Sequence, residues 1–361
     1  MQQRFVFVVL ALLLIFNACK KSGNDTSPGE AVGPISAEEF ASLPPFSFQQ
    51  AIDAYENVTA EDPALLQNES NLARAMFNWL KDNPGGRKGR DSVVMEGARI
   101  FDLASELTKE ERKVVFLNPI DAYGAMGTVD PSIKAAIQTY PCDEDVKYED
   151  GKADALRHAY WNALMVQTTN KDFAEKFATA HESQSVDANA KAMDLHNNII
   201  GRSIAEKYPT ATSDQIKEII SETKFYYIDK PGDAIPAEAK DALVYFKAKR
   251  KFDGAFTGIF TNPDSGGPWK VTYDFNQCGN VIRGQVTLVR DAALHKRRFT
   301  GTVTGDSTII LDVKDPFVFE NPDNNAYCKD QKTTLKGSID QLNGTWTSSN
   351  CTQGGTITLL K

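Results

Sequence analysis

The residues best suited to chemistry are three histidines that fall close together in a chain that has only four. Each lies in a short polar cluster, at residues 154–162, 180–182 and 193–202. Imidazole and carboxylate groups in combination are typical of divalent-metal sites and of general acid–base pairs. The zincin signature HExxH is absent, because His181-Glu182 is followed by Ser-Gln-Ser. Any metal site here must therefore be built in another way.

One face of the first cluster has an unusual composition for a solvated surface. Asp154, His158 and Asn162 recur four residues apart, so on a helix they lie on the same side. Trp161 and Met165 share that side, which places a carboxylate, an imidazole and an amide among large apolar groups. We therefore expect these polar groups to face a neighbouring helix.

The third cluster has the same helical spacing. Asp194, Asn197, Asn198 and Gly201 line one side of a helix, whereas His196 points about 160° away from Asn198 at 3.6 residues per turn. Gly201 has no side chain and would let a neighbouring helix approach closely. This face is therefore the expected partner of the first one, and His196 is expected to point elsewhere.

His181 and Glu182 fall at the end of the intervening helix, where a turn could bring them between the other clusters. Three antiparallel helices would then ring a pocket with six polar side chains, Asp154, His158, His181, Glu182, Asp194 and Asn197. The predicted ligands of a divalent metal are Asp154, His158, His181 and Asp194. Zinc is the candidate cation, because it binds His with Asp or Glu and leaves a position open for water. The predicted catalytic groups are Arg157, His158, Glu182 and Asn197.

Two interpretations of this cluster stay open. In the first, metal-activated water attacks an ester or phosphodiester, and Arg157 or Asn197 steadies the developing anion. In the second, the same groups satisfy one another in a buried hydrogen-bond network that only fixes helix packing. Asp154 and His158, four residues apart, could form such a pair by themselves.

The three clusters together resemble DUF6973, a family of bacterial helical domains of unknown function. The resemblance rests on Asp154-Ala-x-Arg-His-Ala-x-Trp-Asn162, Ala180-His-Glu182 and Met193-Asp-Leu-His-Asn-Asn-x-x-Gly-Arg202, preceded by Asn118-Pro119, and it spans residues 107–208. It implies a shared site at Asp154, Arg157, His158, Trp161, Asn162, His181, Glu182, Asp194, Asn197 and Asn198. Since the family name implies no reaction, the resemblance indicates a shared site and not a shared substrate.

The elements that must position these residues are helices. Ser36-Ala37-Glu38-Glu39 has the capping-box pattern that opens a helix. Apolar periodicity predicts helices over 68–82, 93–107, 108–117, 134–139, 154–168, 173–181, 188–208, 213–222 and 237–251. The stretch from residue 36 to residue 250 is therefore expected to be mostly α-helical.

From residue 252 the pattern changes to the alternation of half-buried strands. Strands are predicted over 252–260, 269–275, 281–289, 298–304, 307–313, 333–339, 344–348 and 354–360. About eight short antiparallel strands predict an up-and-down barrel or a compact sandwich, similar to small lipocalin-like barrels, which can hold an apolar ligand. We expect Trp269, Tyr273, Phe275 and Trp346 in its core. His295 falls in a basic stretch, 290–298, that we expect to be a solvated loop.

The fold class expected is therefore α+β in two domains, with an all-α domain at 36–250 and an antiparallel β-barrel or sandwich at 251–361. A formal charge of −8 and the absence of a basic stripe argue against a nucleic-acid partner. Four cysteines follow Cys19, and no CxxC pair occurs. We expect Cys328 to pair with Cys351, although sequence allows other pairings with Cys142 and Cys278.

The first residues predict export. An apolar run over residues 5–16 follows Arg4, is too short to span a bilayer, and ends in Ala18-Cys19. We expect a lipoprotein signal peptide at 1–18, lipid on Cys19, and a flexible tether at 19–35. The lipid would be the membrane partner and would anchor the protein in the cell envelope, on the outer membrane of a Gram-negative bacterium. The two functions in view are then a metal-dependent hydrolase and a non-catalytic binding or scaffold lipoprotein whose β domain binds a ligand or partner.

Overall fold

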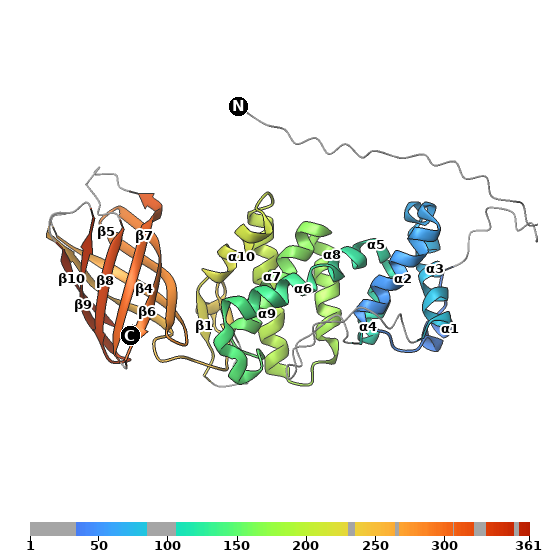
Figure 1. Cartoon of the computed structure of the whole chain (residues 1–361), viewed down its shortest axis with the longest axis horizontal. Helices are drawn as coiled ribbons and strands as arrows, with labels where there is room; N and C mark the ends of the chain where they lie inside the picture. Colours follow the sequence, from blue (N-terminus) through green and yellow to red (C-terminus); the bar gives the residue numbers. More distant parts are fainter. Residues whose placement is uncertain are drawn as a thin grey trace, which may run out of the picture.

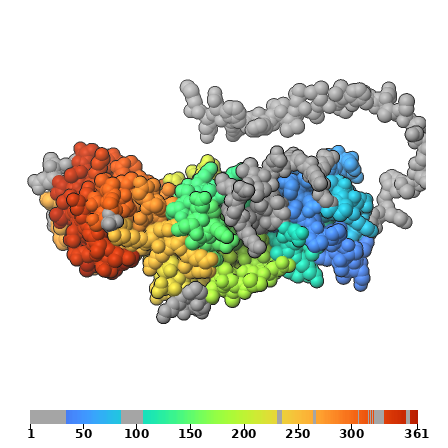
Figure 2. Space-filling view, turned by 60° about the horizontal axis from the view of Figure 1, so that its bottom comes forward, coloured from blue at the N-terminus to red at the C-terminus, as the bar shows by residue number. Residues whose placement is uncertain are grey.

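The computed structural model combines a helical half with a closed β-barrel, as the sequence predicts (Figure 1). It describes residues 34–84, 106–229, 235–263, 267–305, 307–320, 330–349 and 354–361. The expected signal peptide, Cys19 and nearly all of the predicted helix 93–107 lie outside these residues. In the space-filling view the barrel and the first helices lie at opposite ends of an elongated body (Figure 2). Within the described ranges, no helix has the length and apolar character needed to cross a bilayer.

The helical half contains the elements predicted around the polar clusters. Its α-helices are α1 (Ala37–Ser42), α2 (Phe48–Glu61), α3 (Glu69–Asp82), α4 (Lys109–Leu117), α5 (Pro119–Met126), α6 (Val129–Thr139), α7 (Lys152–Thr168), α8 (Lys171–His181), α9 (Ala188–Lys207) and α10 (Ser213–Ser221). Short 3-10 turns are η1 (Pro63–Gln67), η2 (Pro141–Val146), η3 (Glu182–Gln184) and η4 (Ala237–Ala239). The capping box at Ser36 is present, and others begin α2, α4 and α10.

Helix α7 is buried along most of its length because it lies between two apolar cores. Trp161 and Met165 pack into the core that also contains buried residues of α2, α3 and α8. Leu156 and Ala159 pack into a second core, shared with α6, α9 and α10. A helix buried on opposite sides has little freedom to shift, and it is well suited to position functional side chains.

The β half is an eight-stranded closed barrel in which each strand pairs with its neighbours in the sequence. The strands are β3 (Gly254–Asn262), β4 (Gly267–Cys278), β5 (Val281–Arg290), β6 (Ala293–Thr304), β7 (Thr308–Glu320), β8 (Gln331–Gly337), β9 (Gln341–Ser348) and β10 (Gly355–Leu360). Alternate side chains fill its interior, and the predicted core aromatics Trp269, Tyr273, Phe275 and Trp346 are among them. This confirms the barrel over the sandwich.

Two predictions about local structure are wrong. The predicted helix 237–251 forms only the short turn η4, followed by β2 (Leu243–Tyr245), which pairs in parallel with β1 (Phe225–Tyr227). Tertiary contacts override helix propensity there, because the Asn197 side chain hydrogen-bonds both backbone groups of Val244. The basic stretch 290–298 is not a loop, since most of it lies in β6, with His295 and Arg297 facing the barrel interior.

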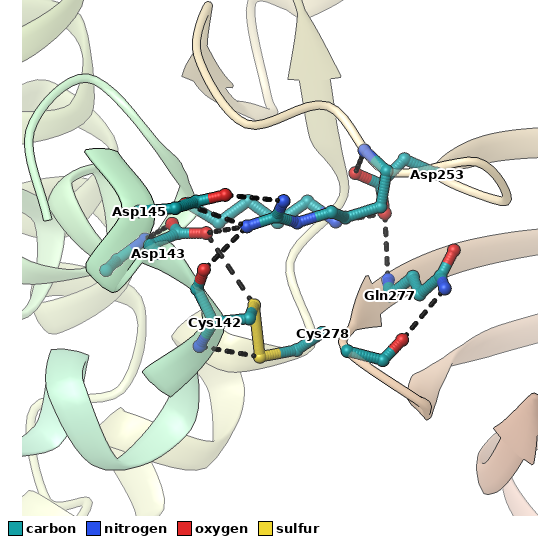
Figure 3. The surroundings of a disulfide bond; sticks show 10 residues. Cys142, Asp143, Asp145, Asp253, Gln277 and Cys278 are labelled. Atoms are coloured by element: carbon teal, nitrogen blue, oxygen red, sulfur yellow. Dashed lines mark hydrogen bonds and ion pairs between the residues drawn. A yellow bond between two sulfur atoms is a disulfide. The ribbon is translucent and has the colours of Figure 1, made fainter. Parts of the chain in front are cut away.

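A buried junction joins the two halves at the start of α7 (Figure 3). Cys142 and Cys278 form a disulfide between η2 and the end of β4. Beside it, Lys152 Nζ lies 2.5 Å from Asp253 Oδ1, and both side chains are at most 2% exposed. The backbone N–H of Gln277 also donates to that carboxylate. The other predicted pairing, between residues 328 and 351, lies outside the described residues.

Candidate functional site

Helix α7 presents Asp154, His158 and Asn162 on one buried face, as their spacing predicts. The start of the helix is fixed by carboxylates, since the backbone N–H of Ala153 donates to Asp143 Oδ2. The backbone N–H of Asp150 donates to Asp154 Oδ2 at 2.8 Å, which orients that carboxylate. The loop before α7 therefore helps to position the first acidic group of the site.

Helix α9 brings Asp194 and Asn198 to the same place. His158 Nε2 lies 3.2 Å from Asp194 Oδ1 and 3.6 Å from Asp154 Oδ1. Such an approach needs the two helix backbones close together, and Gly201 of α9 permits it by packing directly against the backbone of Ala159 in α7. The close approach that the sequence predicts at Gly201 is confirmed.

A chain of hydrogen bonds sets the orientation of the His158 ring. Arg202 Nη1 donates to Asn162 Oδ1, and Asn162 Nδ2 donates to Asn198 Oδ1. That same amide oxygen lies 3.3 Å from His158 Nδ1. Because an amide oxygen can only accept, Nδ1 carries the proton and the lone pair of Nε2 faces the carboxylates. Histidine ligands of metals are commonly oriented by an outer hydrogen bond of this type.

Three residues of this site form the candidate cation centre. Asp154, His158 and Asp194 are all buried, and each offers a ligand atom within 4.8 Å of the others. Glu182 lies behind the imidazole, with its Oε1 3.7 Å from His158 Nδ1. Within the described ranges, neither Asp194 Oδ1 nor Glu182 Oε1 accepts a hydrogen bond. Buried acceptors without donors are costly and indicate a position for a proton, a water or a cation.

Arg157 supplies the positive charge of the cluster. Its Nη2 lies 2.5 Å from Asp154 Oδ1 and 2.6 Å from His158 Nε2. The side chains of Arg157 and Asp194 are 13% and 11% exposed, whereas His158 is 2% exposed. The cluster therefore reaches solvent on the side of Arg157 and Asp194.

The electrostatics of the cluster separate its carboxyl groups. Burial would raise the pKa of Asp154, but the Arg157 charge and the hydrogen bonds from Arg157 and the backbone of Asp150 outweigh it and hold that pKa below its usual value. Burial, together with the carboxylates of Asp154 and Glu182, raises the pKa of Asp194 well above its usual value. Burial likewise raises the pKa of Glu182, and burial followed by the Arg157 charge keeps the pKa of His158 well below its ordinary value. His158 is therefore neutral and able to act as a ligand or base.

Two predicted site residues are not brought into the cation centre. His181 Nδ1 lies 2.8 Å from Glu111 Oε1, so this histidine pairs with α4 and is not one of the grouped ligands. Asn197 holds the backbone of Val244 and so supports β2. His196 Nε2 bonds the carbonyl of Ala242, which confirms that it points away from the cluster. The centre thus contains three of the four predicted metal ligands.

Sequence reasoning missed Glu111 as a partner of His181 and Arg202 as the end of the hydrogen-bond chain. Glu111 gave no local signal beyond the capping box with Thr108 that begins α4. Arg202 closes the third motif, and its spacing of four from Asn198 was the available clue.

The helical half matches one known family model. A model described as a domain of unknown function, DUF6973, matches residues 112–225. The resemblance predicted from the three motifs is therefore confirmed over the helices that build the site. Among curated proteins, none matches the chain. One similar solved structure is described as a redesigned beta barrel, mFAP1, bound to DFHBI. The match has 20% sequence identity and a TM-score of 0.24, and it covers 31% of this chain and 95% of the chain of that structure. That score is too low to support any conclusion about function.

Proposed function

We propose that the helical half holds a divalent cation at Asp154, His158 and Asp194, and that this centre serves hydrolysis of an ester or phosphodiester. The observation that carries the proposal is the convergence of His158 Nε2, Asp154 Oδ1 and Asp194 Oδ1, with Nε2 3.6 Å and 3.2 Å from the two carboxylate oxygens and the ring oriented through its Nδ1 by Asn198. Acceptor atoms this close together need positive charge beside them, and in this structure the Arg157 guanidinium supplies it. One imidazole and two carboxylates form a ligand set that zinc accepts, and that leaves a position for water.

The surrounding residues support this chemistry. When bound, a divalent cation supplies Lewis-acid activation of water and of an ester oxygen. Glu182 is the carboxylate placed to accept a proton, because its Oε1 accepts no hydrogen bond within the described residues. Arg157, at the more exposed edge of the cluster, is placed to bind a negatively charged group.

Metal analysis of the full chain tests the proposal. After stripping and reconstitution, we expect one equivalent of zinc or manganese in the wild-type protein, and loss of affinity of at least tenfold in His158→Ala and Asp194→Asn. His196→Ala is the matched control, since this histidine lies on α9 but bonds Ala242, and it should keep the cation. Absence of stoichiometric cation, with loss of stability in both site variants, would favour a purely structural cluster.

A second candidate function is a non-catalytic binding or scaffold protein. It is favoured by the contact of Arg157 with Asp154 and His158, which already neutralises part of the cluster. In that case the barrel would bind the ligand or partner. Site variants that fold normally and lose hydrolysis of a generic ester, such as p-nitrophenyl acetate or bis(p-nitrophenyl) phosphate, would decide for the enzyme.

We also propose that the protein is lipid-anchored in the cell envelope. The support is the apolar run over residues 5–16 with Cys19 shortly after it, together with the disulfide between Cys142 and Cys278, a bond that persists in oxidising compartments. Cys19→Ala should move the protein from the membrane fraction to the soluble fraction. Unchanged membrane partitioning of this variant would count against the anchor.

A further inference from the structure

The guanidinium of Arg157 occupies the place that a cation would need. Its Nη2 donates to His158 Nε2 at 2.6 Å and to Asp154 Oδ1 at 2.5 Å, and its Nε also donates to Asp154 Oδ1. These are the atoms through which both residues would hold a cation, since His158 Nδ1 already donates to Asn198. One lone pair on Nε2 cannot accept an N–H and coordinate a metal at the same time. Arg157 and a bound cation are therefore mutually exclusive at this position.

The charges of the cluster show why both states are accessible. The buried carboxyl groups of Asp154, Glu182 and Asp194 outnumber the one guanidinium beside them, which contacts Asp154. Arg157 touches Asp154 but has no ion pair with Asp194 among the described contacts. A divalent cation at His158 Nε2 would neutralise both aspartates, whereas Arg157 neutralises one. The exchange of one cation for the other is thus favoured by charge.

We propose that Arg157 fills the cation position in the cation-free protein and leaves it on cation binding, so that the guanidinium then pairs with an anionic substrate group. This inference rests on the proposed cation centre. A buried guanidinium that has lost its carboxylate needs a new anion, because an unpaired buried charge is costly. Arg157 Nη1 is a donor that makes no hydrogen bond within the described residues. The substrate class is therefore a phosphodiester, whose negative charge would pair with this guanidinium, and not a neutral carboxylic ester.

The exchange predicts an unusual response of cation affinity to mutation. In isothermal titration of the stripped full chain with Mn²⁺, Arg157→Gln should bind roughly tenfold or more tightly than the wild type, because no charge-assisted hydrogen bond has to break first. Arg157→Lys keeps the positive charge but lacks the planar guanidinium, and its affinity for Mn²⁺ should lie between those of the wild type and Arg157→Gln. Arg250→Gln removes another arginine, which hydrogen-bonds Asp145 and the carbonyl of Cys142 and none of the ligands, and it should not tighten binding. Tightening in Arg250→Gln as well would show a general effect of charge and would overturn the exchange.

A second titration tests the anionic substrate. Dimethyl phosphate should tighten Mn²⁺ binding several-fold in the wild type and have no effect in Arg157→Gln. Trimethyl phosphate, which is similar in shape but neutral, should have no effect on either protein. If dimethyl phosphate leaves the wild-type affinity unchanged, the assignment of the substrate class is overturned.

The outcomes separate this inference from the proposed function. Wild-type binding that is unchanged or weakened in Arg157→Gln overturns the exchange and leaves the cation centre standing. If Arg157→Gln binds Mn²⁺ and the wild type does not, the exchange is supported and Arg157 keeps the cation position in the wild type. Absence of Mn²⁺ binding in every variant overturns both. If Arg157→Gln does not fold, Arg157→Lys and the two phosphate titrations on the wild type still decide the matter.

Discussion

The contact between α7 and α9 at Gly201 allows a quantitative test of how the site is built. A Cβ added to Gly201 would overlap the carbonyl oxygen of Ala159 and lie 2.6 Å from its carbonyl carbon and 2.8 Å from its Cα. Ordinary contacts of this kind begin near 3.4 Å. The obstacle is backbone, which cannot rotate away as a side chain can, so Gly201→Ala requires the two helices to separate by roughly 1 Å.

The expected cost follows from opposing terms. Overpacking of this kind costs about 1–3 kcal/mol, and the backbone obstacle places Gly201→Ala at the upper end. Replacing a helical glycine with alanine returns about 1 kcal/mol of helix propensity. The net loss in the free energy of unfolding should therefore be about 2 kcal/mol. Cation affinity should fall at least tenfold, because the substitution moves Asp194 away from His158 and metal–ligand distances tolerate only about 0.2 Å.

Denaturant unfolding followed by circular dichroism measures the first effect, and titration with Mn²⁺ measures the second. Gly124→Ala in α5 is the matched control, since the nearest obstacle to its Cβ is the Thr168 methyl group at 3.0 Å, which can shift. It should change the free energy of unfolding by less than about 1 kcal/mol. If Gly201→Ala unfolds and binds Mn²⁺ as the wild type does, the two helices do not position the site in the way described.

Three further predictions concern the junction and the barrel. Lys152→Met leaves its buried carboxylate partner uncompensated and should lower the free energy of unfolding by about 3–5 kcal/mol, whereas Lys171→Met, at an exposed ion pair, should change it by less than about 1 kcal/mol. Burial lowers the pKa of His295 from 6.5 to about 4. The free energy of unfolding should therefore fall by about 2 kcal/mol as the pH drops from 6.5 to about 4. Denaturant titrations of His295→Gln at each pH should lack this fall. Replacing Cys142 and Cys278 together with serine should lower stability by about 2–5 kcal/mol, and equal unfolding midpoints of this variant and the oxidised wild type would contradict that expectation.

The parts of the fold that sequence predicts are those where local and global preferences agree. Helix α4 begins at the capping box of Thr108, and α9 spans Ala188–Lys207 where the sequence predicts a helix over 188–208. The barrel strands alternate with period two, and each pairs with the next in sequence, so no long-range pairing had to be guessed apart from the closing pair of β3 with β10. The helix predicted over 237–251 does not form, because Asn197, a residue distant in sequence, hydrogen-bonds the backbone of Val244.

The faces of the site helices were also predictable, because helical geometry alone separates His196 from Asn198. The contacts of individual side-chain atoms could not be predicted from the sequence. His181 was expected among the metal ligands, but its Nδ1 meets Glu111, which lies in another helix and in no shared motif. Whether His181 contacts Glu111 or the metal ligands depends on how α4 packs against α8. The residue spacing of either helix does not predict that packing.

Arg157 shows most clearly what spacing cannot supply. It is adjacent to His158 in sequence, and neighbouring residues on a helix point in different directions, so spacing argues against a contact between their side chains. The Nη2 atom of Arg157 nevertheless reaches His158 Nε2, because its long side chain is drawn to the carboxylate of Asp154 three residues before it. A guanidinium that has bent back to the ligands of a cation can be displaced by that cation. The rival functions therefore depend on the same atoms, and the affinity of Arg157→Gln for Mn²⁺ distinguishes a cluster closed by arginine from one that exchanges it for a metal.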